Sequence, residues 1–124
     1  MSVTISKEAN NCMVVTVAGI FTYEDLGAVQ STAKAMLNSS VKTNCLVLAQ
    51  QFTGWGKEGN WGDLTFMYEN DPLIGKIAVV GEKKRQVELL MFLGGGMRQA
   101  AVKYFFPEQE KEARVWLLEP SKPM

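Results

Sequence analysis

The sequence predicts an α/β domain with a mostly parallel sheet flanked by helices. Residues 45–49 (CLVLA) and 76–80 (KIAVV) are almost continuously apolar, which is typical of strands buried on both faces of a parallel sheet. A glycine-rich stretch and a helical pattern separate the two runs, and this is the order of a parallel crossover unit. Because ligands of such sheets bind beyond the carboxyl ends of the strands, we expect any site there.

A β-hairpin is expected first, ahead of three α–β units and a C-terminal helix. Residues 3–6 have a weak strand pattern, and residues 12–18 (CMVVTVA) have a strong, valine-rich one. Turn residues at positions 8–11 separate the two runs, as a hairpin requires. Gly19 is expected to end the second strand.

The first helix is expected to begin at a capping box. Residues 22–25 (TYED) have the pattern of this motif with Asp25 in place of the usual Glu, and Phe21 and Leu26 occupy the two staple positions. A helix to about residue 38 is then predicted by apolar side chains at helical spacing. These are Leu26, Val29, Ala33, Met36 and Leu37.

Strands and helices alternate through the second half of the chain. Three further strands are expected at residues 44–50, 76–80 and 101–105. Asn60 is expected to cap one helix, residues 82–93 to form another that residues 94–96 (GGG) end, and Pro107 to open the last. Val87, Leu90 and Met91 share one face of the helix at 82–93 in this reading. The closing helix packs through Ala113, Trp116 and Leu117.

Length and composition narrow the possible functions. The 124 residues suit one domain at 1–119 with a frayed tail at 120–124, and 13 basic residues balance 13 acidic ones. This balance gives no overall field toward nucleic acid or an anionic membrane, so neither is an expected partner. The absence of histidine excludes Ser-His-Asp and Cys-His catalysis and removes the commonest zinc ligand. We expect no catalytic residues, no metal site and no cofactor.

Cysteine usage and hydropathy indicate a cytoplasmic protein. Cys12 and Cys45 each lie in an apolar run without C-x-x-C spacing, so we expect buried thiols in a reducing compartment. The first residues lack an apolar segment of signal-peptide length, and no run is long enough to span a membrane. Stable membrane insertion is therefore not expected.

The ordered set of motifs across residues 12–118 resembles the SpoIIAA-like family, bacterial single-domain relatives of the STAS and CRAL-TRIO folds. The residues that carry this resemblance are Phe52, Gly54, Trp55, Trp61, Asp63, Leu64, Phe66, residues 76–81, Tyr104, Phe105, Glu112, Ala113, Trp116 and Leu117. The resemblance implies a sheet of four or five strands and no established catalytic activity. Thr53 is the only hydroxyl where STAS antagonists carry a phosphorylatable serine, so that switch is not carried over.

Residues 52–59 are the first candidate site. Thr53, Gly54, Trp55 and Gly56 follow a predicted strand, and the glycines would let backbone N–H groups approach an anion or a polar ligand. In the alternative reading the glycines serve only a tight loop, and Trp55 covers the end of the sheet.

Lys83, Lys84 and Arg85 are the second candidate site. They follow the strand at 76–80 and so lie at the same predicted end of the sheet, where they could bind a phosphate or a carboxylate. Family members often have an aromatic residue here. A solvated run of charge is the alternative.

Leu89, Phe92 and Leu93 make the helix at 82–93 apolar on all sides near its end. A helix that covers a sheet needs only one apolar face, so these side chains require further cover. A homodimer interface, a lipid-accepting groove or a local partner would supply it. The neighbouring helix and Trp116 are the alternative cover.

These observations favour a non-enzymatic binding or regulatory domain. Its ligand would be a small amphipathic molecule, lipid-like or anionic, or a protein partner. A purely structural homodimer is one alternative. A weak hydrolase or transferase is the other; it would use Thr53 or Cys45 as nucleophile and Lys57 or Lys76 as a base whose pKa burial lowers.

Overall fold

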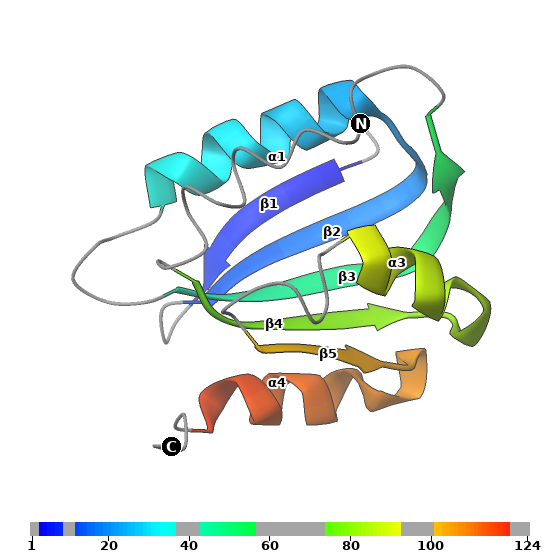
Figure 1. Ribbon diagram of the computed structural model, residues 1–124. Coiled ribbons are helices and arrows are strands. Elements are labelled where there is room, and N and C mark those ends of the chain that lie inside the picture. The colour runs from blue at the N-terminus through cyan, green and yellow to red at the C-terminus, as the bar shows by residue number, and fades with distance from the viewer. Residues whose placement is uncertain (1–2, 9–11, 37–42, 57–73, 93–100, 120–124) are drawn as a thin grey trace.

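The computed structural model describes residues 3–8, 12–36, 43–56, 74–92 and 101–119, and they form one five-stranded sheet in the order β1-β2-β3-β4-β5 (Figure 1). The strands are β1 (Val3–Glu8), β2 (Cys12–Phe21), β3 (Thr43–Trp55), β4 (Ile74–Gly81) and β5 (Ala101–Phe105). β1 pairs with β2 antiparallel, and all other neighbours are parallel. The predicted fold class, with its opening hairpin and mostly parallel sheet, is confirmed.

Helices cover both faces of this sheet. They are α1 (Tyr23–Met36), α3 (Gln86–Phe92) and α4 (Glu110–Leu118), and short 3₁₀ turns, η2 (Lys83–Arg85) and η3 (Pro107–Gln109), precede the last two. Ala33 of α1 and Leu89 of α3 pack into one hydrophobic cluster, whereas Ala113 and Leu117 of α4 pack into a second. Figure 1 shows α1 above and α4 below the sheet, with α3 in front of β3.

Alternation along the strands explains why the core has two parts. Successive side chains of a strand point to opposite faces, so Val79 joins the cluster under α1 and α3 while Ala78 and Val80 join the cluster under α4. All three residues are fully buried. The apolar run that predicted a strand buried on both faces is thereby explained.

Four strands, β1 to β4, are longer than expected, and β2 and β3 extend furthest beyond their expected carboxyl ends. β2 continues past Gly19 to Phe21, and Gly19 adopts φ 70° beside an irregularity in the β2–β3 ladder. β3 continues past residue 50 to Trp55, where Ile20 pairs with Gly54 and Phe21 pairs with Trp55. Gly19 was expected to end its strand, but its left-handed conformation absorbs the irregularity and the pairing continues.

The start of α1 is the capping box that the sequence predicts. The Thr22 hydroxyl accepts a hydrogen bond from the Asp25 amide at 3.1 Å, and the Asp25 carboxylate accepts one from the Thr22 amide at 2.9 Å. The reciprocal pair satisfies two backbone donors at the helix start. The expected end near residue 38 lies outside the described residues, as do the helix expected after Asn60 and the glycines at 94–96.

The predicted buried face of the third helix is wrong. Leu89 is 5% exposed and packs in the core, whereas Val87 and Met91 are 73% and 75% exposed, and Leu90 is half-buried. The 3₁₀ turn η2 precedes α3 and winds at three residues per turn. Leu89 packs beside Gly81 of β4, and Arg85 binds the Thr53 carbonyl, so these contacts turn the Leu89 side of α3 toward the sheet.

Buried polar groups hold the C-terminal end of α4. The Lys76 ammonium donates to the carbonyl oxygens of Trp116 at 2.8 Å and Glu119 at 2.5 Å. The side-chain amide of Asn44 donates to the Leu117 carbonyl at 2.8 Å, and its oxygen accepts from the Lys76 backbone amide. These donors satisfy carbonyls that a helix end leaves without partners, and the cation lies at the negative end of the helix dipole.

Candidate binding surface at the carboxyl ends of the strands

Arg85 links the two candidate segments, residues 52–56 and residues 83–85, which the sequence places at one end of the sheet. Its guanidinium donates to the Thr53 carbonyl at 2.6 Å and to the Glu88 carboxylate at 2.9 Å. Its Cζ atom also lies 5.3 Å from the centre of the Phe52 ring. Thr53 and Arg85 therefore meet, but their contact is internal to the protein. Arg85 fastens the start of α3 to the end of β3 and is only partly accessible to a ligand.

Residues 52–55 form a strand and not the expected loop. The Trp55 ring lies 4.8 Å from the Phe52 ring and 6.2 Å from the Phe21 ring, both in edge-on geometry. Phe52 is 2% exposed, and Trp55 is half-buried. The pairing with β2 and the burial of these rings stabilise the extension, so the aromatic residues serve the core at this end of the sheet.

Gly56 does not offer its amide to an anion. Its N–H donates to the Phe21 carbonyl at 2.8 Å, and a Cβ at this position would lie 3.1 Å from Cα of Thr22. A side chain at this position would thus press against Thr22, where two backbone segments approach closely. Gly54 lies within the β2–β3 ladder. The prediction of an anion-binding glycine loop at Gly54 and Gly56 is replaced by a strand extension, and the residues from 57 to 59 lie outside the described part of the chain.

Tyr104 holds the turn that carries the cations. Its hydroxyl donates to the Glu82 carbonyl at 2.6 Å. Burial, together with the carboxylates of Glu82 and Glu88, raises the pKa of this phenol to about 12. A Cβ on Gly81 would lie 2.5 Å from the same hydroxyl, so a side chain there would displace the tyrosine from its present position. The sequence places Tyr104 in the last strand, but only the register shows what its hydroxyl meets.

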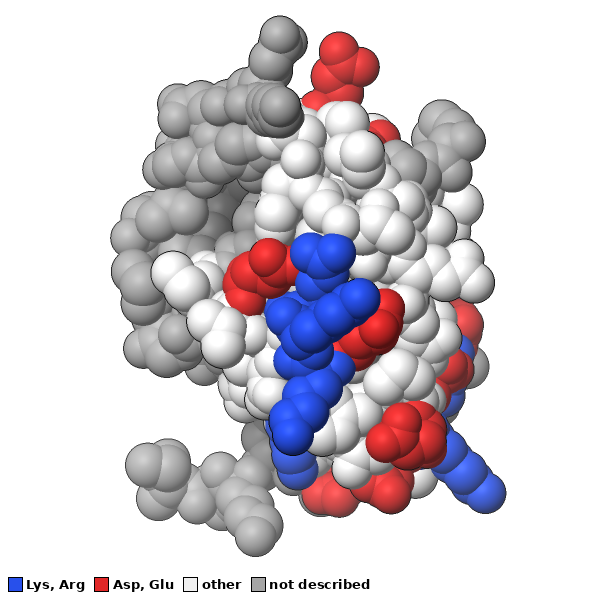
Figure 2. Space-filling view, turned by 90° about the vertical axis from the view of Figure 1, so that its right-hand side faces the viewer, with Lys and Arg blue, Asp and Glu red and all other residues white. Residues whose placement is uncertain are grey.

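Lys83 and Lys84 are the cations of this segment that face solvent. Both are exposed, and Lys84 reaches the Glu82 carboxylate only at 3.9 Å with most of its side chain in water. Such a pair contributes little and leaves the ammonium available to a ligand. Figure 2 shows this end of the molecule, where lysine and arginine side chains form a column with acidic side chains on both sides.

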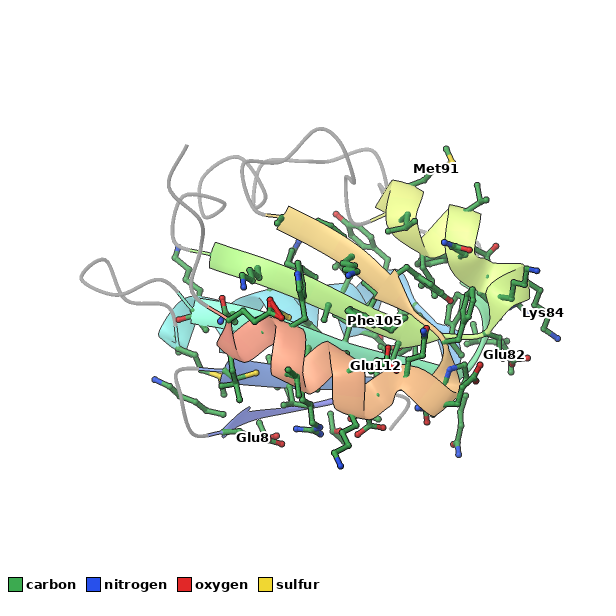
Figure 3. The ribbon with its side chains drawn as sticks, turned by 90° about the horizontal axis from the view of Figure 1, so that it is seen from below. Glu8, Glu82, Lys84, Met91, Phe105 and Glu112 are labelled. Atoms are coloured by element: carbon green, nitrogen blue, oxygen red, sulfur yellow. The ribbon has the colours of Figure 1, made fainter. Side chains whose placement is uncertain are left out.

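Two large apolar side chains continue this surface along α3. Val87 and Met91 lie four residues apart on one side of α3, and Lys84 precedes them in the turn η2. In Figure 3, Lys84 and Met91 project away from the sheet at the same end of the molecule. We define the α3 surface as Lys83, Lys84, Val87 and Met91. The sequence pattern identified the lysines and missed the exposure of the apolar pair.

The homodimer interface was expected at Leu89, Phe92 and Leu93, but Leu89 is buried within the protein. Leu89 packs in the core against the position of Gly81, so it is not available to a second copy of the chain. Phe92 ends α3, but its side chain and all of Leu93 lie outside the described residues.

The hydrolase alternative loses two of its proposed groups. Cys45 is buried within β3, and the Lys76 ammonium is bound by the carbonyls at the end of α4. Cys12 is half-buried in β2, where burial and the Glu8 carboxylate raise the pKa of its thiol although Arg114 lowers it. Lys57 lies outside the described residues.

Within the described ranges, no helix is long and apolar enough to cross a membrane.

Comparisons with known proteins agree with this fold. The model of the SpoIIAA-like family matches residues 12–118. A crystal structure of an uncharacterized protein of the DUF3478 family from Shewanella loihica PV-4, described as having a SpoIIAA-like fold, is 18% identical. It superposes with a TM-score of 0.67 over 93% of this chain and 91% of that chain. No curated protein matches. SpoIIAA-like folds are those of regulatory binding domains. The family match covers most of the sequence, and the chain therefore belongs to the SpoIIAA-like family.

Proposed function

We propose that this protein is a non-enzymatic regulatory domain that acts by binding a ligand or a partner at the α3 surface. The observation that carries the proposal is the exposure of Val87 and Met91, at 73% and 75%, on a short helix whose Leu89 is fixed in the core. Single exposed apolar residues are common, but two on one side of a helix beside two lysines make a compact amphipathic surface.

Three contacts on the inner side of the α3 surface hold it in place. Tyr104 binds the Glu82 carbonyl, Arg85 binds the Thr53 carbonyl and Glu88, and Leu89 packs in the core. A surface that is ordered before binding loses less conformational entropy on association. This arrangement favours recognition, and the absence of histidine removes the commonest general acid–base group from the whole chain.

The test is an NMR titration of isotope-labelled protein with three probes of different chemistry. Laurate represents a lipid-like anion, inorganic phosphate represents a small anion, and a helical peptide with leucines and glutamates represents a protein segment. We expect saturable shifts of backbone amides between residues 83 and 91 with at least one probe. The Val87→Ser/Met91→Ser variant should lose them.

The matched control is Val115→Ser/Leu118→Ser, which removes an exposed apolar pair from α4. This variant should retain the shifts at the α3 surface. The proposal is wrong if none of the three probes produces saturable shifts between residues 83 and 91, or if the Val87/Met91 variant responds as the unmodified protein does.

A further inference from the structure

We propose that the occupant of the α3 surface is an acidic, amphipathic helical segment of another protein. The inference rests on the proposed function of this surface and adds the chemistry of the partner. It follows from the order of side chains along α3, from their charge and from the size of the apolar contact.

The order of side chains gives the surface a direction. Lys84 lies in the turn η2, and Val87 and Met91 follow one helical turn apart on α3, so this stripe of the surface is about 10 Å long at the rise of a helix. The cation is at one end, and the two apolar side chains follow it. A partner helix matches this stripe when two apolar side chains one turn apart are followed, at the end facing Lys84, by a carboxylate.

The two exposed lysines of the surface favour an acidic partner. Lys83 and Lys84 are exposed, while the nearby Glu88 carboxylate is bound by Arg85. Among the described residues, Glu82 is the acid paired with Lys84, at 3.9 Å. Positive charge therefore remains on the outer side of the turn. Complementary charge on a partner raises the rate of association and excludes partners with basic residues at the same place.

The limited size of the surface disfavours a lipid bilayer or a second copy of the chain. Basic clusters that bind anionic membranes contain about four to eight lysines or arginines, and this surface has two. The net charge of the chain is zero, so no wider field adds to them. A stable homodimer buries about 800 Å² on each copy, far more than two apolar side chains provide. A short helical segment suits both the area and the charge.

The experiment is a selection from a displayed library of helical peptides against the full chain. Two positions one turn apart are fixed as leucine, and the flanking positions vary among acidic, basic and neutral residues. We expect the enriched sequences to carry Asp or Glu together at one end. A synthetic peptide of the enriched consensus should bind, and its affinity should fall about tenfold with Lys83→Glu/Lys84→Glu.

A charge swap supplies the decisive comparison. A consensus peptide with lysines in place of its acidic residues should bind the Lys83→Glu/Lys84→Glu protein more tightly than it binds the unmodified protein. The control protein is Lys34→Glu/Lys111→Glu, which reverses two exposed lysines on α1 and α4. It should bind the acidic consensus as the unmodified protein does.

Other results overturn the inference in distinguishable ways. Enriched peptides without acidic residues, or equal binding to the charge-reversed protein, would show that the partner is not acidic. Lysine-dependent binding of phosphatidylserine vesicles without peptide binding would identify a lipid surface instead. A dimer in light scattering that Val87→Ser/Met91→Ser dissociates would identify a second copy. If laurate or phosphate shifts the α3 surface and acidic peptides fail, the proposed function stands and only this inference falls.

Discussion

Thr43 is a buried residue whose hydroxyl has no hydrogen-bond partner among the described residues. It is 1% exposed at the start of β3, opposite Ile74 of β4. A buried polar group without a partner costs about 1–3 kcal/mol in desolvation, and valine has nearly the same shape without that group. Thr43 therefore makes the domain less stable than valine would at the same position.

We expect Thr43→Val to raise the free energy of unfolding by about 1 kcal/mol. Urea unfolding followed by tryptophan fluorescence measures the change. Thr16→Val, at an exposed position of β2, is the control and should change stability little. A loss of stability in the Thr43 variant would mean that its hydroxyl has a partner in the protein.

Tyr104 makes a prediction about alkaline pH. The pKa of its phenol in the folded protein is about 12, above the ordinary value of 10, so folding favours the protonated form. The resulting stabilisation is fully present below about pH 10 and is lost as pH rises through about 12. Stability should therefore fall across this interval more steeply in the unmodified protein than in Tyr104→Phe.

Ultraviolet absorbance of the phenolate, recorded as pH rises, measures the ionisation directly. The rise in absorbance that accompanies ionisation near pH 12 should be absent in Tyr104→Phe. Tyr23→Phe serves as the comparison and should leave that rise in place. Ionisation of Tyr104 near its ordinary pKa of 10 would mean that its hydroxyl does not hold the turn through a hydrogen bond to the Glu82 carbonyl.

At the scale of elements, the C-terminal end of α4 depends on a buried lysine. Lys76→Met should lower the free energy of unfolding by about 1.5–3 kcal/mol, because two charge-assisted hydrogen bonds to helix carbonyls are lost. Both Lys76 and Lys103 lie near the Trp116 ring, with their ammonium nitrogens 5.1 Å and 5.9 Å from its centre. Lys103 is exposed, so Lys103→Met is a suitable control. A similar loss in both variants would assign the effect to the ring contact.

The extension of β3 makes Trp55 part of the core at this end of the sheet. We expect Trp55→Ala to lower the free energy of unfolding by about 3 kcal/mol, because its contacts with Phe21 and Phe52 are lost. Ile20→Ala, at an exposed position of the neighbouring strand, should cost much less. A loss below about 1 kcal/mol for Trp55→Ala would instead favour a mobile cover over a ligand site.

The orientation of α3 can be tested by comparing its two sides. Leu89→Ser should lower the free energy of unfolding by about 2–5 kcal/mol, because a buried leucine is replaced by a small polar residue. Val87→Ser/Met91→Ser should change it by less than about 0.5 kcal/mol, because both side chains are exposed. The opposite ranking would restore the orientation that the sequence pattern predicts. Thermal and urea unfolding of the variants decide between the two.

At the scale of the whole molecule, the sheet separates two hydrophobic cores that different helices cover. Valines and aromatic rings of β2 and β3 pack under α1 and α3, whereas α4 alone packs on the second core through Ala113 and Leu117. The α3 surface lies at the carboxyl ends of the strands, where a parallel sheet was expected to place a site (Figures 1 and 2). The balanced net charge makes recognition there depend on local side chains.

The site illustrates what could be predicted and what could not. Topology alone predicted that Thr53 and Arg85 lie at one end of the sheet, and Arg85 does bind the Thr53 carbonyl. Their use in an internal contact was not predictable, because it depends on the distance between backbones 32 residues apart. The exposed pair on α3 was missed because apolar residues lie on several sides of this helix, and only the packing of Leu89 in the core decides which side is buried.

The sequence by itself determined the α/β class, the opening hairpin, the cap of α1 and the burial of β4 on both faces. Each of these depends on local spacing or on a continuous apolar run, both of which are visible in a linear pattern. Only the tertiary structure decided the length of β3, the exposed side of α3 and the partners of Lys76 and Tyr104. These depend on register and on contacts between distant segments, such as the 40 residues that separate Lys76 from Trp116.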